Sequence, residues 1–152
     1  MDAQILPQKL YLEDLKVGQE FMSDPHPLDS EQIIAYARQF DPQPFHLDEE
    51  AAKDTFFQGL AASGWHTMSI TMKLMVQNLP FSQGVIGAGG DIAWPRPTRP
   101  GDILRVKSTI REIIPSKSRP DRGIVRVYNL TLNQADEVLQ ELTANLLVFR
   151  RT

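Results

Sequence analysis

The stretch LAASGWHTMSITMKLMVQNLP, residues 60–80, decides the fold that we expect for this chain. After Gly64 it is mostly apolar, and its apolar residues recur at helical spacing. These residues are Trp65, Met68, Met72, Met75, Val76 and Leu79. Because the segment carries few charges on any side, the helix is predicted to be largely buried. Pro80 closes the segment, so the sequence predicts one long, buried helix between Gly64 and Pro80.

Beyond this helix the apolar residues alternate with polar ones, which is typical of strands. Four segments show the alternation: GVIGAGGDIAWPRP (84–97), DILRVKSTIREIIP (102–115), GIVRVYNLTLNQ (123–134) and EVLQELTANLLVFRR (137–151). Near the N-terminus, residues 15–21 predict a further short strand with a turn at Gly18. Strands that follow one helix favour an α+β fold with an antiparallel sheet. We therefore expect about five strands wrapped around one long central helix, which is the hotdog arrangement.

Two shorter helices are predicted before the long one. The first begins with Asp29 or Ser30 as its N-cap and ends at Asp41, because Pro42 disfavours helical geometry in the residue before it. Its apolar residues also fall at helical spacing, and they are Ile33, Ile34, Ala37 and Phe40. The second helix is predicted over residues 48–57, where acidic residues in the first turn suit the helix dipole.

Composition and charge limit the classes of partner. The chain has 152 residues, of which 41% are hydrophobic and 23% charged, so we expect a single globular domain over residues 1–152. The net charge of −3 shows no basic excess, so neither nucleic acid nor an anionic membrane is an expected partner. With no cysteine, disulfides and thiol catalysis are excluded. Residues 1–15 lack a signal-peptide pattern and no apolar run is long enough for a membrane span, so a cytoplasmic location is expected.

The segment DPQPFH, residues 41–46, places a carboxylate and an imidazole five positions apart on stiff chain. Its two prolines fix two backbone angles and pre-organise the side chains of Asp41 and His46. Phe45 can anchor the segment in apolar surroundings, where burial shifts pKa values and favours proton transfer near neutral pH. The plainer alternative is a stiff connection between two helices, with His46 on the surface.

The segment ASGW, residues 62–65, lies at the predicted start of the long helix. The first N–H groups of a helix have no internal partner and carry partial positive charge. Because Gly64 has no side chain, a ligand carbonyl could approach its N–H closely and be polarised by it. The structural alternative is a glycine that only permits close packing at the start of the helix.

Three segments together resemble the MaoC-like dehydratases, which are the single-hotdog relatives of (R)-specific enoyl-CoA hydratases. They are FDPQPFHLDEEAA (40–52), GLAASGWHT (59–67) and WPRPTRPGDIL (94–104). The resemblance extends over about residues 10–150. Its most specific part is the signature Asp-Xaa-Asn-Pro-Xaa-His, which this chain carries from Asp41 to His46 with Gln43 in place of the usual asparagine.

The resemblance implies that Asp41 and His46 hold and activate a water molecule. It also implies that the N–H of Gly64 binds the carbonyl of an acyl thioester. Around these three residues we expect contacts with the substrate from Gln43, Phe45, Ser63 and Trp65. The reaction implied is the interconversion of an enoyl-CoA and a hydroxyacyl-CoA by addition or elimination of water. A homodimer, or a multiple of dimers, is expected because hotdog proteins usually assemble in that way.

Two other functions remain open from the sequence. The same fold hosts acyl-CoA thioesterases, and a protein of this shape could also bind acyl thioesters without catalysis. No cofactor beyond the CoA thioester substrate and no metal is expected, since His46, Asp48 and His66 lack the spacing of a zinc site. Five basic residues near loops are candidates for binding CoA phosphates, namely Arg96, Arg99, Lys117, Arg119 and Arg122. The methionines of the long helix are expected in the core, with the lining of an acyl tunnel as the alternative.

Overall fold

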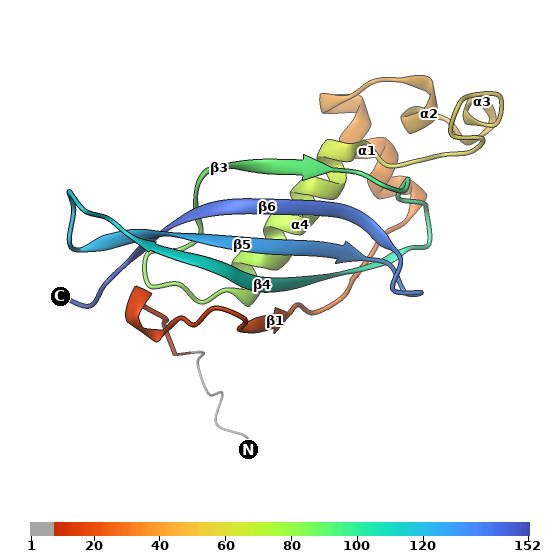
Figure 1. The fold of residues 1–152 in the computed structure, drawn as a ribbon. Coiled ribbons are helices and arrows are strands. Elements are labelled where there is room, and N and C mark those ends of the chain that lie inside the picture. The colour runs from red at the N-terminus through yellow and green to blue at the C-terminus, as the bar shows by residue number, and fades with distance from the viewer. Residues whose placement is uncertain (1–7) are drawn as a thin grey trace, which may run out of the picture.

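A sheet that wraps around one long helix is the main feature of the computed structural model, which describes residues 8–152 (Figure 1). Residues 1–7, which belong to the segment predicted to carry no signal peptide, lie outside the described residues. The strands are β1 (Glu20–Met22), β2 (His26–Pro27), β3 (Ile86–Ala93), β4 (Ile103–Pro115), β5 (Arg122–Leu132) and β6 (Val138–Phe149). All of their pairings are antiparallel, in the order β1-β4-β5-β6-β3, and β2 also pairs with β4. The expected α+β hotdog fold is confirmed.

The sheet has one strand more than the five expected, because residues 26–27 also pair with β4. The N-terminal strand is also shorter than predicted, because residues 17–18 form the turn that precedes β1. Gly18 has a φ of 92°, a left-handed conformation that glycine adopts without strain. These differences lie at the edge of the sheet and leave its order unchanged.

The helices are α1 (Ser30–Phe40), α2 (Pro44–Leu47), α3 (Glu49–Ala52) and the central α4 (Gly64–Asn78), with a short 3-10 turn at Leu12–Asp14. The predicted start of α1 is confirmed, because the carboxylate of Asp29 accepts the N–H of Gln32 at 2.9 Å. Its predicted end is confirmed as well, since Asp41 is the C-cap residue. No helix among residues 8–152 is both long and apolar enough to cross a membrane.

The prediction of one helix over residues 48–57 was wrong. Only α3 is helical there, and a separate turn of helix, α2, precedes it within the DPQPFH segment. Helix α3 stops because the N–H and the hydroxyl of Thr55 both donate to the carbonyl of Ala52, at 3.1 and 2.6 Å. Gln58 then adopts a positive φ of 54°, which turns the chain away from a helical path.

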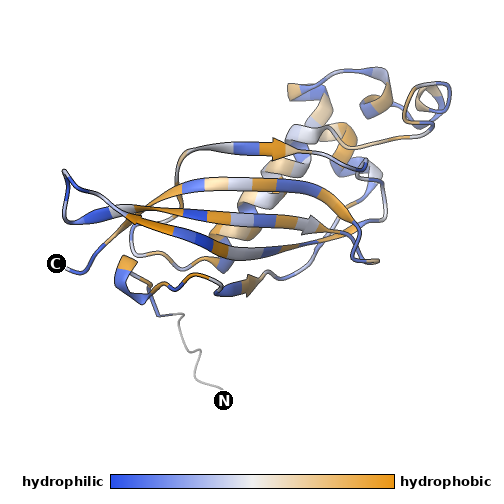
Figure 2. Cartoon of the chain, viewed as in Figure 1, coloured by the Kyte–Doolittle hydropathy of each residue, from blue (hydrophilic) through white to orange (hydrophobic). Residues whose placement is uncertain are grey.

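The core lies between α4 and the concave face of the sheet. Alternating residues of β4, β5 and β6 point inward, and the alternation is visible as bands of orange along the strands in Figure 2. Met75 is fully buried among them, as expected of a core methionine. Three residues predicted on buried faces are instead exposed: Phe40 by 67%, Trp65 by 58% and Val76 by 54%.

Strand β3 is an edge strand whose residues are exposed along nearly its whole length. Its outer edge pairs with no strand in residues 8–152, and the register with β6 shifts between Gly87 and Gly90. Helices α1, α2 and α3 gather at one end of the sheet, beyond the start of α4 (Figure 1). The β4–β5 hairpin lies at the opposite end.

Candidate active site

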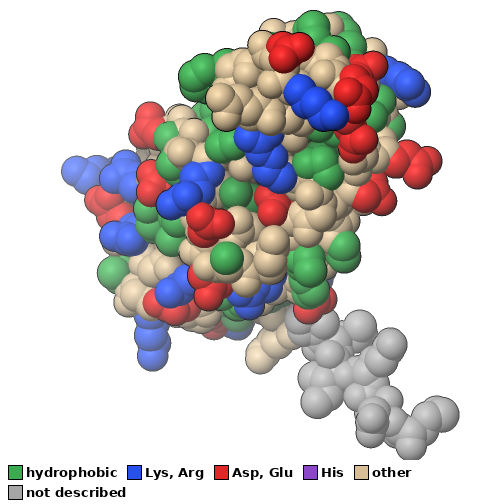
Figure 3. Space-filling view, turned by 90° about the vertical axis from the view of Figure 1, so that its right-hand side faces the viewer, with side chains coloured by type: hydrophobic (Ala, Val, Ile, Leu, Met, Phe, Trp, Pro, Cys, Tyr) green, Lys and Arg blue, Asp and Glu red, His purple; other side chains and the backbone are tan. Residues whose placement is uncertain are grey.

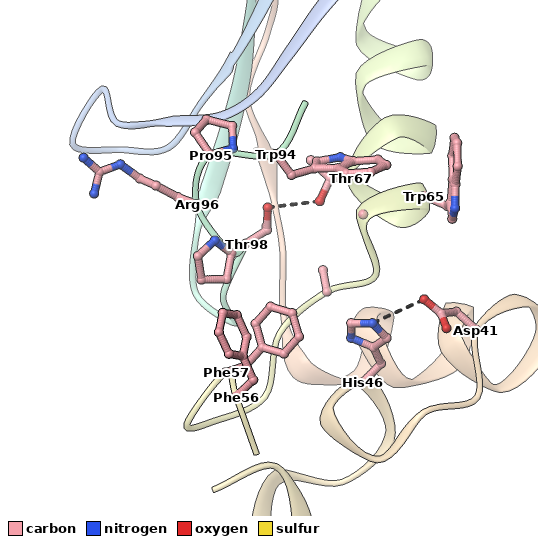
Figure 4. A pocket seen from close by; sticks show the side chains of 13 residues that line it. Asp41, His46, Phe56, Phe57, Trp65, Thr67, Trp94, Pro95, Arg96 and Thr98 are labelled. Carbon is pink, nitrogen blue, oxygen red and sulfur yellow. Dashed lines mark hydrogen bonds and ion pairs between the residues drawn. The ribbon is translucent and has the colours of Figure 1, made fainter. Parts of the chain in front are cut away.

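A cavity of about 560 Å³ opens where the first turn of α4 meets α2 and the segment that follows β3 (Figure 4). Of the residues predicted to form a site, Asp41, His46, Gly64 and Trp65 line it. The structure thus brings together two segments that lie about twenty positions apart in the sequence. Most of the remaining lining was not predicted: Phe56, Phe57, Ala62, Thr67, Trp94, Pro95, Pro97 and Thr98.

Asp41 and His46 face one another across the gap between α1 and α2. Asp41 is the residue at which α1 ends, and Pro44 starts α2 so that His46 falls in its single turn. The Nε2 atom of His46 lies 3.2 Å from Oδ2 of Asp41, and the side chains are 5% and 19% exposed. The proline-rich segment therefore holds a nearly buried imidazole against a carboxylate at the wall of the cavity.

The hydrogen bonding of His46 decides which of its nitrogens can exchange a proton at the site. Its Nδ1 lies 2.6 Å from the carbonyl oxygen of Ala61, and a carbonyl can only accept, so Nδ1 carries a hydrogen. Nε2 is then the nitrogen that gains and loses a proton, and it is the one that faces Asp41. The neutral ring is a base at Nε2, and the protonated ring forms an ion pair with the carboxylate.

The carboxyl of Asp41 is kept ionised. Burial acts to raise its pKa, but three groups outweigh this effect: the side-chain amide of Gln43, the hydroxyl of Ser63 and the charge of a protonated His46. The pKa of Asp41 is consequently lower than its ordinary value of 3.8. Gln43 donates from Nε2 to Oδ1 of Asp41 at 2.5 Å, so it acts on the carboxylate instead of lining the cavity.

Ser63 is the N-cap residue of α4 and is completely buried. Its hydroxyl lies close enough to lower the pKa of Asp41, yet it forms no hydrogen bond of regular geometry within the described residues. Its side chain does not line the cavity, so Ser63, like Gln43, acts on the site through the carboxylate of Asp41. Direct contact of Ser63 with a substrate stays a prediction.

The first turn of α4 directs free N–H groups toward the cavity region. The first helical hydrogen bonds run from the N–H groups of His66 and Thr67 to the carbonyl of Ser63, at 2.9 and 3.1 Å. The N–H groups of Gly64 and Trp65 precede these bonds and therefore have no acceptor within the helix. They carry the partial positive charge of the helix N-terminus, which suits a carbonyl oxygen that becomes negative.

Main-chain hydrogen bonds fix the segment that leads into α4. The N–H of Ala61 donates to the carbonyl of Phe45 at 3.0 Å, and the N–H of Ala62 donates to the carbonyl of Thr98 at 2.9 Å. Because the carbonyl of Ala61 also orients His46, one short extended segment sets the position of both the imidazole and the start of α4. This coupling cannot be predicted from the sequence, because Ala61 and Ala62 take part in it through main-chain atoms only.

Trp94, the first residue after β3, is the largest unpredicted side chain at the cavity. Its indole covers Gly64 so closely that a Cβ atom there would lie 2.7 Å from Cε2 of the tryptophan. It also meets Trp65 edge to face, with ring centres 5.3 Å apart. The structural role first weighed for Gly64, close packing at a helix start, is therefore present beside its expected role as a donor.

Phe45, which was predicted to contact the substrate, and the nearby His66 do not line the cavity. Phe45 is half-buried, and its ring packs edge-on against His46 and at a tilt against Phe57, with centres 4.5 and 5.0 Å apart. His66 is buried in the first turn of α4. Its ring stacks on Tyr36 at 4.5 Å, but its buried Nδ1 has no partner among the described residues. Burial, together with the nearby His26, lowers the pKa of His66 to about 4.

The five basic candidates for phosphate binding separate into three groups. Only Arg96 lines the cavity, where it forms an exposed ion pair with Glu137 at 2.9 Å. Arg99 donates to the carbonyls of three loop residues, Phe57, Gly59 and Leu60. Lys117, Arg119 and Arg122 lie in or beside the β4–β5 hairpin, at the far end of the sheet (Figure 1). Over the end that Figure 3 shows, Lys and Arg are interspersed with Asp and Glu instead of forming one basic surface.

Known proteins are similar to this chain in sequence, and one of them also in its solved structure. The chain is 58% identical to a MaoC-like dehydratase of Rhodospirillum rubrum, whose crystal structure superposes with a TM-score of 0.93 over 94% of this chain and 99% of that one. The uncharacterized protein YdeM of Bacillus subtilis is 31% identical, over 91% of this chain and 99% of its own length. The 3-hydroxybutyryl-CoA dehydratase of Methylorubrum extorquens is also 31% identical, over 72% of this chain and 69% of its own length.

The pattern of the MaoC like domain family matches residues 14–131, which include α1, the Asp41–His46 pair, α4 and most of the sheet. The match therefore covers both the fold and the two segments that meet at the cavity. This chain belongs to the MaoC-like domain family.

Proposed function

We propose that this protein is a hydro-lyase of the (R)-specific enoyl-CoA hydratase type, which adds water to an enoyl-CoA thioester or removes it from a hydroxyacyl-CoA in the cytoplasm. The observation that carries the proposal is the pair of Asp41 and His46, held 3.2 Å apart beside the free N–H groups of α4. The dehydratase of M. extorquens supports the general reaction. The CoA thioester is the substrate, and the reaction requires no further cofactor.

In the hydration direction the carbonyl of the thioester accepts the N–H of Gly64. A water molecule lies between Nε2 of His46 and the carboxylate of Asp41. As its oxygen adds to the β-carbon of the enoyl group, the pair takes one proton from the water. The enolate that forms is stabilised by the helix N-terminus, and a proton is then delivered to the α-carbon. Because the two groups are in contact, they exchange protons as a pair.

Thioester hydrolysis is the second candidate, since the same water could attack the carbonyl carbon. The geometry favours hydration. The pair lies before the central helix, so that the carbonyl oxygen sits on α4 while the acyl carbons face Asp41 and His46. The two reactions are readily separated here, because hydrolysis alone releases a free thiol and the protein contains no cysteine that would add to the signal.

We also propose that the protein is a homodimer. The outer edge of β3 is unpaired within residues 8–152, and exposed strand edges promote pairing with another chain. The neighbouring surface of α4 exposes Trp65 and Val76, which is unusual for residues of a central helix. Pairing of two β3 edges would cover both features and enclose the cavity further.

The decisive experiment follows the loss of enoyl absorbance with crotonyl-CoA in parallel with the release of free CoA thiol. Wild-type protein should consume the enoyl group without releasing thiol. Asp41→Asn and His46→Gln should each lower turnover by at least about a hundredfold, the usual scale for an acid or base. The double variant should cost little more than the worse single one, because both groups act on one water.

His26→Gln serves as the matched control, since His26 lies outside the cavity lining and should leave turnover unchanged. Near-wild-type turnover in either Asp41→Asn or His46→Gln, with the melting temperature retained, would remove the pair from the mechanism. Release of thiol at the rate of enoyl loss would favour the thioesterase.

A further inference from the structure

The wall of the cavity opposite His46 is formed by Trp94 (Figure 4). This residue follows the exposed end of β3, but its indole turns inward over Gly64 and against Trp65. Its Nε1–H donates to Oε1 of Gln140 at 2.9 Å. The side chain is therefore fixed from both sides, by packing against the start of α4 and by a hydrogen bond to the sheet.

Gln140 is fully buried on β6, and its remaining bonds are also satisfied. Its Nε2 donates to the hydroxyl of Thr71 at 3.0 Å and lies 3.6 Å from the sulfur of Met68. The hydroxyl of Thr71 donates in turn to the carbonyl of Thr67 at 2.8 Å, and it lies 2.6 Å from the hydroxyl of Thr131. Gln140, Thr71 and Thr131 are all 0% exposed. We call these three residues the polar layer.

The polar layer lies between α4 and the sheet, directly behind Trp94. An acyl chain that grew past the indole would have to displace Trp94 from Gln140. It would then place hydrocarbon against the amide of Gln140, whose Oε1 had lost the indole N–H, and close to two buried hydroxyls. Leaving a buried amide oxygen unpaired costs about 1–3 kcal/mol, which offsets the gain of about 0.8 kcal/mol from each of the first few methylene groups that are buried. The cavity is thus closed behind Trp94 to a long apolar chain.

We infer that Trp94, held in place by Gln140, determines substrate specificity by limiting the site to thioesters with short acyl chains. The inference rests on the proposed function for the placement of the thioester, with its carbonyl at Gly64. Trp94 contacts the acyl group directly, whereas Gln140 is a positioning residue that acts through Trp94.

The test compares kcat and KM for crotonyl-, hexenoyl- and octenoyl-CoA. Wild-type protein should lose at least about tenfold in kcat/KM between crotonyl- and octenoyl-CoA, because one misfitted methylene group is worth about tenfold or more. Trp94→Ala should reduce this difference by at least about tenfold, mainly through a lower KM for octenoyl-CoA. Gln140→Leu should also reduce the difference in kcat/KM between crotonyl- and octenoyl-CoA, but by less, because Trp94 remains and only its hydrogen bond to Gln140 is lost.

Phe56→Ala is the matched control. Phe56 is an aromatic residue that also lines the cavity, but its ring packs against Phe57 and not against Trp94, so its loss should alter all three substrates alike. A binding series by calorimetry with saturated butyryl- and octanoyl-CoA repeats the comparison without turnover. If octanoyl-CoA binds wild-type protein no tighter than butyryl-CoA and Trp94→Ala reverses this order, the inference stands even when no enoyl thioester is hydrated. That last result would reject only the proposed function.

The inference is overturned, and the hydratase retained, if wild-type protein hydrates octenoyl-CoA as well as crotonyl-CoA. It is also overturned if folded Trp94→Ala keeps the wild-type preference. Should Trp94→Ala fail to fold, Gln140→Leu and Trp94→Phe decide, since both keep an aromatic wall without the anchoring hydrogen bond. An unchanged preference in both would reject the role of the anchor.

Discussion

Gly64→Ala should destabilise the protein, because the added methyl group collides with Trp94. The new Cβ would lie 2.7 Å from Cε2 and 3.0 Å from both Cδ2 and Cζ2 of the indole. Carbon atoms prefer separations of about 3.5–4.0 Å, so the ring must retreat by roughly 1 Å. Its hydrogen bond to Gln140 and its packing against Trp65 oppose that movement. Overpacking of this kind costs about 1–3 kcal/mol.

Alanine is the better helix former by up to about 1 kcal/mol, although less of this is gained in a first turn. The net loss in the free energy of unfolding should therefore be about 1–2 kcal/mol. For a chain of this size that corresponds to a fall of roughly 3–6 °C in melting temperature. Urea denaturation at fixed pH gives the free energy directly, and thermal unfolding of the same samples checks it.

A double-mutant cycle with Trp94→Ala isolates the collision. In the Trp94→Ala background Gly64→Ala should be neutral or stabilising, which gives a coupling energy of at least about 1 kcal/mol. Gly87→Ala is the matched control, because a Cβ at Gly87 meets nothing within 4 Å, and it should stay within about 0.5 kcal/mol of wild type. An equal cost of Gly64→Ala with and without the indole would refute the reasoning, as would a stabilising effect in the wild-type background.

Two further predictions concern His66 and Arg99. Folding lowers the pKa of His66 from 6.5 to about 4. Between these pH values the unfolded chain binds a proton that the folded chain does not bind. The free energy of unfolding should therefore fall as the pH drops from 6.5 toward 5. The slope should approach about 1.4 kcal/mol per pH unit and flatten in His66→Gln, and an unchanged slope in urea titrations would assign it to other groups. Arg99→Lys should cost about 1–3 kcal/mol in thermal unfolding, because an ammonium cannot reach the three loop carbonyls that the guanidinium binds. The exposed Arg96→Lys should change little, and equal losses in the two variants would contradict this role of Arg99.

The parts of the fold that the sequence predicted correctly are those determined by local pattern. Asp29 caps α1 because the N–H group that its side chain accepts belongs to Gln32, three residues later. Pro42 disfavours helical geometry in Asp41, which is the C-cap residue of the same helix. The alternation in β4, β5 and β6 predicted their buried faces, since side chains of a strand alternate by geometry alone. The prediction of a helix over residues 48–57 was too long because acidic residues indicate where a helix starts but not where it ends.

The site could be predicted only as far as its residues lie in short segments. Asp41 and His46 were found because five positions of stiff chain separate them. The contact of Gly64 with Trp94 joins residues thirty positions apart, and that of Trp94 with Gln140 joins residues forty-six apart. No spacing rule covers such contacts, so the largest side chain of the cavity was missed. Trp65 was assigned to a buried face because the helix was expected to be apolar on all sides, and its exposure became visible only with the sheet in place.

The extended segment that precedes α4 has a consequence for how this site can change in evolution and in redesign. Ala61 and Ala62 hold the neighbouring chain through main-chain atoms only, and the same carbonyl that Ala61 presents to His46 lies three residues before Gly64. The side chain of Ala61 could therefore be replaced by another small residue without changing these contacts, whereas that of Ala62 also lines the cavity. The number of residues in the segment must stay the same, because a single insertion would move the carbonyl that binds His46 relative to the start of α4. If this segment is transferred to another protein scaffold, keeping its length therefore matters more than keeping its amino-acid composition.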